Sequence, residues 1–218
     1  MIFTIREVLD AIIMSFIFGI IFSDFFSRYK KKDLKKGSGI FTQHHSKEIE
    51  YDPISEYKAS SGKKLGGLDL SWDNIKFSMA IVAPAIILHE LGHKFVAIGF
   101  GAEATFHISY FFLGIALVLK LMNSPFIFLV PAFVAYPAGA ITPLQSSMVA
   151  GAGPFVNLLI FLGSSIALKY SKKMSERSVL LLGLTKQVNL FLAIFNMIPF
   201  RPFDGGHFFQ GIFQSIGL

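Results

Sequence analysis

Four long apolar runs constrain the fold of this chain more than any other feature of its sequence. They cover residues 8–26, 74–100, 147–168 and 179–198, and each is close to the roughly 20 residues that a helix needs to cross the hydrocarbon core of a bilayer. The 218-residue chain is 53% hydrophobic and contains 25 phenylalanines, more apolar side chain than a water-soluble domain of this length keeps off its surface. The sequence therefore predicts a multi-pass membrane protein.

The distribution of polar residues divides the chain into three parts. Residues 1–29 are expected to form an N-terminal transmembrane helix, because the bulky exit SDFFSRYK and the lack of a small-residue cleavage site argue against a signal peptide. Residues 30–72 are rich in Gly, Ser, Lys, Glu and Asp and are expected to form a polar extramembrane loop. Residues 73–218 would then form the core of the protein.

The segment 99–143 interrupts the helical pattern. Four prolines break its apolar residues into short pieces rich in β-branched and aromatic side chains, which favours strands at 105–112 and 115–121, joined around Leu113-Gly114, and a further extended piece near 126–136. The alternative is a pair of short helices that form a membrane hairpin. The expected fold class is a polytopic α-helical membrane protein, with about four to six transmembrane helices and a small membrane-associated β region.

The second apolar run contains the stretch IILHELGHKFV, residues 86–96. Ionisable side chains at membrane depth cost at least about 2.5 kcal/mol each, so they usually face a partner or a cavity and serve a function. His89 and His93 are four residues apart and project from one face of a helix, where both can reach a single cation such as zinc. Glu90 lies beside His89, as a general base for metal-assisted hydrolysis requires.

A catalytic zinc site needs a third protein ligand, with one position left for water. Because the chain has no cysteine, this ligand must be a histidine or a carboxylate. Asp204 is one candidate, since it follows the last apolar run in NMIPFRPFDGG, where two prolines stop the helix and two glycines let the chain turn. The alternative is an ordinary turn aspartate before Gly-Gly.

Three pieces of this sequence, in this order, resemble the site-2 protease family of intramembrane zinc metalloproteases. They are HELGH at residues 89–93, AGPFVN at 152–157 and NMIPFRPFDGG at 196–206. The resemblance implies that His89, His93 and Asp204 bind one Zn²⁺ per chain and that Glu90 is the catalytic base. It also implies that segment 99–143 corresponds to the family's membrane-associated β segment, whose edge receives the substrate in extended form.

Substrate-binding roles are expected for Asn196 and Asn157. Asn196 would donate hydrogen bonds to a substrate carbonyl or oxyanion, the role that the resemblance implies, and the alternative is an amide that satisfies backbone groups at a helix end. Asn157 would line the site, or serve only the close packing of helices. His107 and His207 are not expected to bind the metal.

The net charge of +6 does not indicate a nucleic-acid-binding protein, because the basic residues form short runs beside apolar segments. The expected partners are instead a transmembrane protein substrate and the lipid bilayer, with the chain in the cell membrane. The positive-inside rule would place the basic segments 28–36 and 169–177 in the cytosol. The family resemblance would place the catalytic centre near the cytosol, at the opposite end of the same helices, so the two arguments conflict.

The expected function is therefore that of an intramembrane zinc metalloprotease. It would hydrolyse peptide bonds in or near transmembrane segments of membrane proteins, as in regulated intramembrane proteolysis. One alternative is a membrane zinc-binding or transport protein, since intramembrane His and Asp clusters also mark ion pathways. Another is a catalytically silent membrane-helix chaperone, against which the presence of Glu90 argues.

Overall fold

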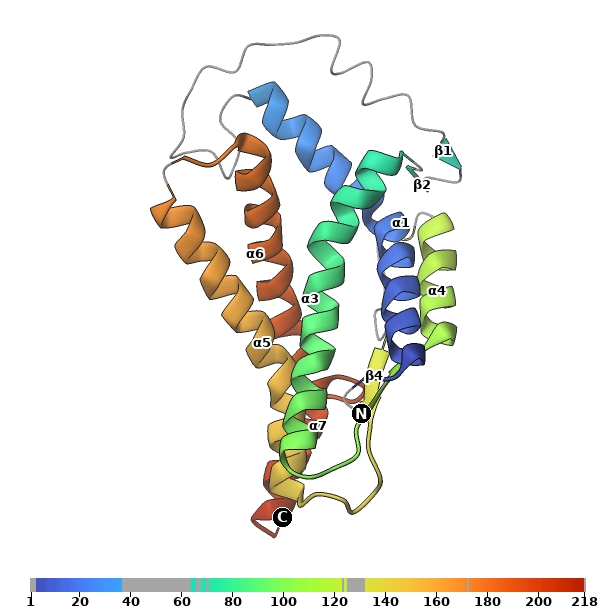
Figure 1. Cartoon of the computed structure of the whole chain (residues 1–218), viewed down its shortest axis with the longest axis vertical. Coiled ribbons are helices and arrows are strands. Elements are labelled where there is room, and N and C mark those ends of the chain that lie inside the picture. The colour runs from blue at the N-terminus through green and yellow to red at the C-terminus, as the bar shows by residue number, and fades with distance from the viewer. Residues whose placement is uncertain are drawn as a thin grey trace.

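The computed structural model describes residues 3–36, 64–65, 68–69, 71–122, 124, 132–171 and 173–217. These residues form a bundle of helices with two small antiparallel sheets of two strands each (Figure 1). The elements in chain order are α1 (Ile5–Lys36), β1 (Lys64–Leu65), β2 (Leu68–Asp69), α3 (Trp72–Gly99), β3 (Thr105–Ile108), α4 (Tyr110–Leu121), β4 (Ala132–Ala135), α5 (Pro143–Tyr170), α6 (Glu176–Asn196) and α7 (Asp204–Ser215). Within this part of the chain, α1, α3, α5 and α6 are long and apolar enough to cross a membrane, which confirms the predicted polytopic α-helical class.

Helix α1 begins with a capping box formed by Thr4 and Glu7. The Thr4 N–H donates to Glu7 Oε2 at 2.8 Å, and the Glu7 N–H donates to Thr4 Oγ1 at 3.2 Å, which satisfies two donors that a helix start otherwise leaves unpaired. The helix continues to Lys36, although the polar loop was predicted to begin at residue 30, because its lysine-rich end consists mostly of good helix formers. Residues 37–63 of the predicted loop lie outside the described residues.

Helix α3 lies at the centre of the bundle and matches the predicted span 74–100. It packs against α1 on one side and against α5 and α6 on the other. Buried side chains along α3, including Phe77, Ile81 and Ile86, join a core that α1, α4, α6 and both strands β3 and β4 share. Because α3 also carries HELGH, this packing holds the two histidines inside the protein.

The segment between α3 and α5 contains a pair of strands. β3 and β4 run antiparallel, with Phe106 opposite Val134 and Ile108 opposite Ala132. This pairing confirms the first half of the strand predicted at 105–112, which ends at Ile108 because α4 begins at Tyr110. It also confirms the extended piece predicted near 126–136, although residues 126–131 lie outside the described part. Since β3 and β4 lie side by side, the segment between them starts and finishes at the same end of the bundle.

The second predicted strand, residues 115–121, is wrong. These residues belong to α4, so the chain makes no hairpin around Leu113-Gly114. Leu113 and Ala116 are three residues apart on one helical face and are buried in the core with α1, and two polar side-chain contacts also join α4 to α1. A helix satisfies its own backbone hydrogen bonds, and a short apolar run has no period that would distinguish it from a strand. The short-helix alternative therefore holds for this part of the segment.

Helices α5 and α6 form the antiparallel pair that the last two apolar runs predicted. A second capping box, made by Thr142 and Gln145, starts α5, and Pro143 occupies its first position, where a missing N–H costs nothing. In Figure 1 the start of α5, the end of α3 and α7 lie at one end of the bundle. The end of α1 and the connection between α5 and α6 lie at the other end, so the two basic segments are on the same side, as predicted.

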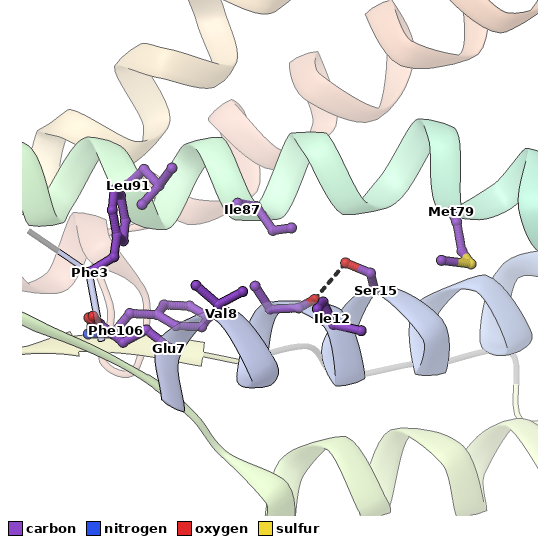
Figure 2. Close-up of a pocket in the computed structure, with 10 residues that line it drawn as sticks. Phe3, Glu7, Val8, Ile12, Ser15, Met79, Ile87, Leu91 and Phe106 are labelled. Carbon is purple, nitrogen blue, oxygen red and sulfur yellow. Dashed lines mark hydrogen bonds between the residues drawn. The ribbon is translucent and has the colours of Figure 1, made fainter. Parts of the chain in front are cut away.

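A cavity of about 380 Å³ lies between α1 and α3. Figure 2 shows its largely apolar lining, to which Val8 and Ile12 of α1 and Ile87 and Leu91 of α3 contribute. Ile87 and Leu91 are each two residues from a histidine of HELGH, which corresponds to about 200° around a helix. The cavity therefore lies on the face of α3 that points away from the histidines.

Candidate metal centre

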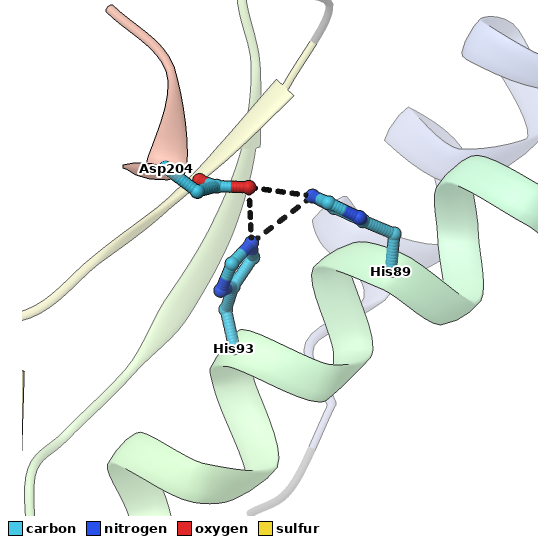
Figure 3. Close-up of side chains that lie close together, drawn as sticks. All are labelled: His89, His93 and Asp204. Atoms are coloured by element: carbon cyan, nitrogen blue, oxygen red, sulfur yellow. Dashed lines mark hydrogen bonds and ion pairs between the residues drawn. The ribbon is translucent and has the colours of Figure 1, made fainter. Parts of the chain in front are cut away.

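Helix α3 presents His89 and His93 from one face, and the first residue of α7 brings Asp204 against them (Figure 3). The Nε2 atoms of the two histidines are 3.1 Å apart. Asp204 Oδ2 lies 3.0 Å from His89 Nε2 and 3.4 Å from His93 Nε2. Three possible ligand atoms thus converge on one point, from two helices that are far apart in the sequence.

Two glycines allow the start of α7 to approach the end of α6. A Cβ on Gly205 would lie 2.4 Å from the carbonyl carbon of Met197, and a Cβ on Gly206 would lie 2.7 Å from the backbone nitrogen of Arg201. Any other residue would push α7 away, because close-packed backbone cannot absorb such overlaps. The Asp-Gly-Gly stretch therefore builds a tight turn, and that turn directs Asp204 toward the histidines.

The spacing of the three atoms fits a tetrahedral zinc site. Zinc binds histidine nitrogen and carboxylate oxygen at about 2.0–2.2 Å, so the edges of the tetrahedron are about 3.3–3.6 Å long. The observed separations of 3.0, 3.1 and 3.4 Å differ from these edges by a few tenths of an ångström. Two histidines and one carboxylate also form a donor set found in catalytic zinc enzymes, which leaves a fourth position open. The group is able to hold one zinc ion.

Helix α5 shapes the other side of the histidine pair. A Cβ on Gly153 would lie 2.4 Å from His93 Nε2 and 2.6 Å from His89 Nε2, so only glycine leaves room for both rings and an ion. One turn before Gly153, the Val149 carbonyl lies 2.7 Å from His93 Nδ1, and one turn after it, Asn157 Nδ2 lies 3.1 Å from His89 Nδ1. The outer nitrogen of each imidazole therefore contacts α5.

The group is buried but open on the side of the aspartate. The side chains of His89 and His93 are 7% and 8% exposed, whereas that of Asp204 is 24% exposed. Burial would raise the pKa of Asp204, but the hydrogen bonds with His89 and His93 outweigh burial and hold this pKa below its usual range. A lowered pKa favours the carboxylate form, which is the form that binds a metal.

Glu90 and Asn196, the other residues predicted to act at the site, have different surroundings. Glu90 is 6% exposed and lies within electrostatic reach of His89, His93 and Asp204, which suits a proton acceptor beside the ligands. Asn196 is the last residue of α6 and is half-buried. Its hydrogen bond to a substrate stays a prediction.

The other polar residues considered in the sequence are not among the possible metal ligands. Asn157 is fully buried with its amide against His89, and its contact with substrate stays a prediction. His107 lies in β3 and hydrogen-bonds to Thr105 Oγ1 at 2.9 Å. His207 is an exposed residue of α7. Neither histidine joins the group of possible ligands among the described residues.

Two contacts of the site could not be predicted from the sequence. The acceptor for His93 Nδ1 is the backbone carbonyl of Val149, and a carbonyl has no sequence signal. Lys94, the next residue after His93, is 1% exposed and forms an ion pair with Glu7 of α1. The only signal for Glu7 is its place three residues after Thr4, which predicts a helix cap and not a partner on another helix.

Comparisons with known proteins show which families and proteins this chain is similar to. The model of Peptidase family M50 matches residues 159–217, which include Asn196 and Asp204. A protein of Synechocystis sp. named "Putative zinc metalloprotease" is 33% identical to the chain over 132 residues. A protein of Methanocaldococcus jannaschii with the same description is 34% identical over 129 residues. No solved structure gives a significant match.

The resemblance to the site-2 protease family is thereby confirmed. The matches cover 61% and 59% of this chain, and they span 30% of the Synechocystis protein and 66% of the M. jannaschii protein. Both relatives are named as zinc metalloproteases, and the group of His89, His93 and Asp204 in this chain could hold a metal ion.

Gly153 of α5 gives a direct test of the centre. Because the added methyl group would collide with both imidazoles, Gly153→Ala is expected to weaken zinc binding at least about tenfold, the lower bound for loss of outer support around a metal. Gly163→Ala is the matched control, because Gly163 lies on the same helix with nothing within 4 Å of an added Cβ. Equal zinc affinity of the two variants, measured by chelator competition, would contradict the proposed position of the ion.

Proposed function

We propose that this chain is an intramembrane zinc metalloprotease that hydrolyses peptide bonds in or near transmembrane segments of membrane proteins. The observation that carries the proposal is the convergence of His89 Nε2, His93 Nε2 and Asp204 Oδ2 within 3.0–3.4 Å of one another, inside a bundle of helices long enough to span a membrane. Buried imidazoles and a carboxylate in such a setting need a shared partner, and a zinc ion fits their spacing.

The residues of the site divide the chemistry among them. His89, His93 and Asp204 would hold the zinc, which when bound polarises a scissile carbonyl and makes water more acidic. Glu90 would accept the proton of the attacking water and then deliver it to the leaving amine. Its burial beside the histidines keeps it close to this proton without making it a ligand.

The half-buried Asn196 would contribute to binding of the transition state. Its amide donates hydrogen bonds, and its place at the end of α6 lies a few residues before the turn that holds Asp204. A donor in this position would stabilise the charge that develops on the carbonyl oxygen during attack.

The strand pair supports binding of the substrate in extended form. The N–H of Phe106 in β3 is already used, because it donates to Glu7 Oε1 at 2.7 Å. In the part of the chain that the structure describes, no strand pairs with the other edge of β4, and Val134 of β4 packs on the cluster that contains Val149. A substrate strand added to β4 would make main-chain hydrogen bonds with little dependence on sequence.

The partners and location follow from this reaction. The substrate would be a transmembrane protein that unwinds locally at the site, and the surrounding solvent would be the lipid bilayer of the cell membrane, which the chain crosses several times. No nucleic acid is involved. Cleavage of such substrates would place the protein in regulated intramembrane proteolysis.

Cleavage of a model transmembrane substrate by the purified chain tests this function. We expect cleavage that a zinc chelator abolishes and that added zinc restores. Cleavage that persists in excess chelator would contradict the metal mechanism. Movement of zinc across liposomes that contain the chain, without any cleavage, would instead favour the transport alternative.

A further inference from the structure

The hydrogen atom on each imidazole decides whether that ring can bind a metal. A neutral histidine carries its proton on one ring nitrogen and offers a lone pair on the other. Both Nε2 atoms face Asp204 Oδ2, so binding of zinc there requires both protons to be on Nδ1. For His93 this tautomer is fixed, because Nδ1 lies 2.7 Å from the carbonyl oxygen of Val149, which can only accept.

His89 needs an equivalent acceptor, and Asn157 is the residue at its Nδ1. The contact of 3.1 Å is made by the amide group of Asn157, which is fully buried. In the structure the Nδ2 atom of Asn157 faces Nδ1 of His89. The Oδ1 atom of Asn157 has no hydrogen-bond partner in the described part of the chain. The two ends of an amide have nearly the same shape, and their assignment follows from the hydrogen bonds they can make.

We infer that Asn157 is a positioning residue for the metal: its Oδ1 accepts a hydrogen bond from Nδ1–H of His89 and so directs the Nε2 lone pair toward the zinc. This inference rests on the proposed function, since the tautomer matters only if zinc binds at Nε2. It assigns the buried amide to the metal ligand and not to the substrate.

The spacing of residues along α5 also supports a positioning role for Asn157. Val149, Gly153 and Asn157 are spaced four residues apart, so they lie along one face of α5. The two outer residues contact the Nδ1 atoms of His93 and His89, and the glycine between them leaves room for the rings. One face of α5 thus supplies an acceptor for each histidine of α3.

Zinc affinity, measured by chelator competition, tests the inference without any activity assay. Asn157→Leu keeps a buried side chain of similar size but removes the acceptor, and we expect zinc affinity to fall about 10- to 100-fold. The matched control is Asn189→Leu, because Asn189 of α6 is equally buried and its amide bonds to Thr185 of its own helix. The control should keep the wild-type affinity.

Asn157→Asp separates the accepting role from a donating one. A carboxylate still accepts from Nδ1–H but cannot donate, so this variant should bind zinc at least as tightly as the wild type. Affinity at least tenfold weaker in Asn157→Asp would overturn the inference, even if Asn157→Leu fails to fold. Wild-type affinity in a folded Asn157→Leu would also overturn it, and the proposed function would stand. A wild-type chain that binds no zinc would overturn both.

Discussion

Replacing Glu90 by glutamine is expected to abolish proteolysis while zinc remains bound. Glutamine has nearly the same shape as glutamate but cannot accept a proton, and loss of a general base costs about 10²- to 10⁴-fold in rate. The proposed ligand atoms belong to His89, His93 and Asp204, so zinc binding should be unaffected. The measurement is the rate of cleavage of a transmembrane substrate, with zinc content determined on the same sample.

Glu103→Gln provides the matched control for this substitution. Glu103 is an exposed carboxylate in the turn between α3 and β3, so its replacement should change neither cleavage nor zinc content. If zinc-loaded Glu90→Gln protein cleaved substrate at a rate close to that of the wild type, Glu90 would not be the base.

The second large effect is expected at the ion pair that joins α1 to the helix of the histidines. Lys94 and Glu7 are 1% and 5% exposed, and Glu7 Oε1 accepts hydrogen bonds from both Lys94 Nζ and the Phe106 N–H. Removal of one partner from a buried ion pair leaves an uncompensated charge and costs about 3–5 kcal/mol. We therefore expect Glu7→Gln to lower the free energy of unfolding by about this amount.

A double-mutant cycle distinguishes loss of the ion pair from general damage. In Glu7→Gln/Lys94→Met the single glutamine oxygen can accept from the Phe106 N–H but not also from the Thr4 N–H, and no charge is left buried, so part of the lost stability should return. The exposed Glu103→Gln should change the free energy of unfolding by less than about 0.5 kcal/mol. Additive effects of the two single substitutions, measured by reversible unfolding in mixed micelles, would show that the pair is not coupled.

The candidate ligands were predictable because their chemistry leaves a local pattern in the sequence. His89 and His93 are one helical turn apart, and ionisable groups in an apolar run indicate a functional site. Asp204 was less certain from the residues by themselves, since an aspartate before Gly-Gly is common in turns. In the structure Gly205 and Gly206 form a close turn that carries Asp204 to the histidines, and its role as a metal ligand stays a prediction.

The errors arose where long-range contacts decide the local structure. Residues 115–121 look like a strand by composition, but packing of Leu113 and Ala116 on α1 makes them helical. Val149 and Asn157 of α5 contact the two imidazoles because of how α3 and α5 pack together. No local sequence pattern predicts this packing. The buried pair Glu7–Lys94 likewise joins residues of different helices.

The zinc content of the purified protein tests the central claim most directly. We predict about one zinc per chain in the wild type, and much less in Asp204→Ala after both are dialysed against the same weak chelator, because two histidines do not by themselves hold a catalytic zinc. A wild-type chain free of zinc after incubation with the ion would contradict the account. So would Asp204→Ala protein that kept a full equivalent of zinc.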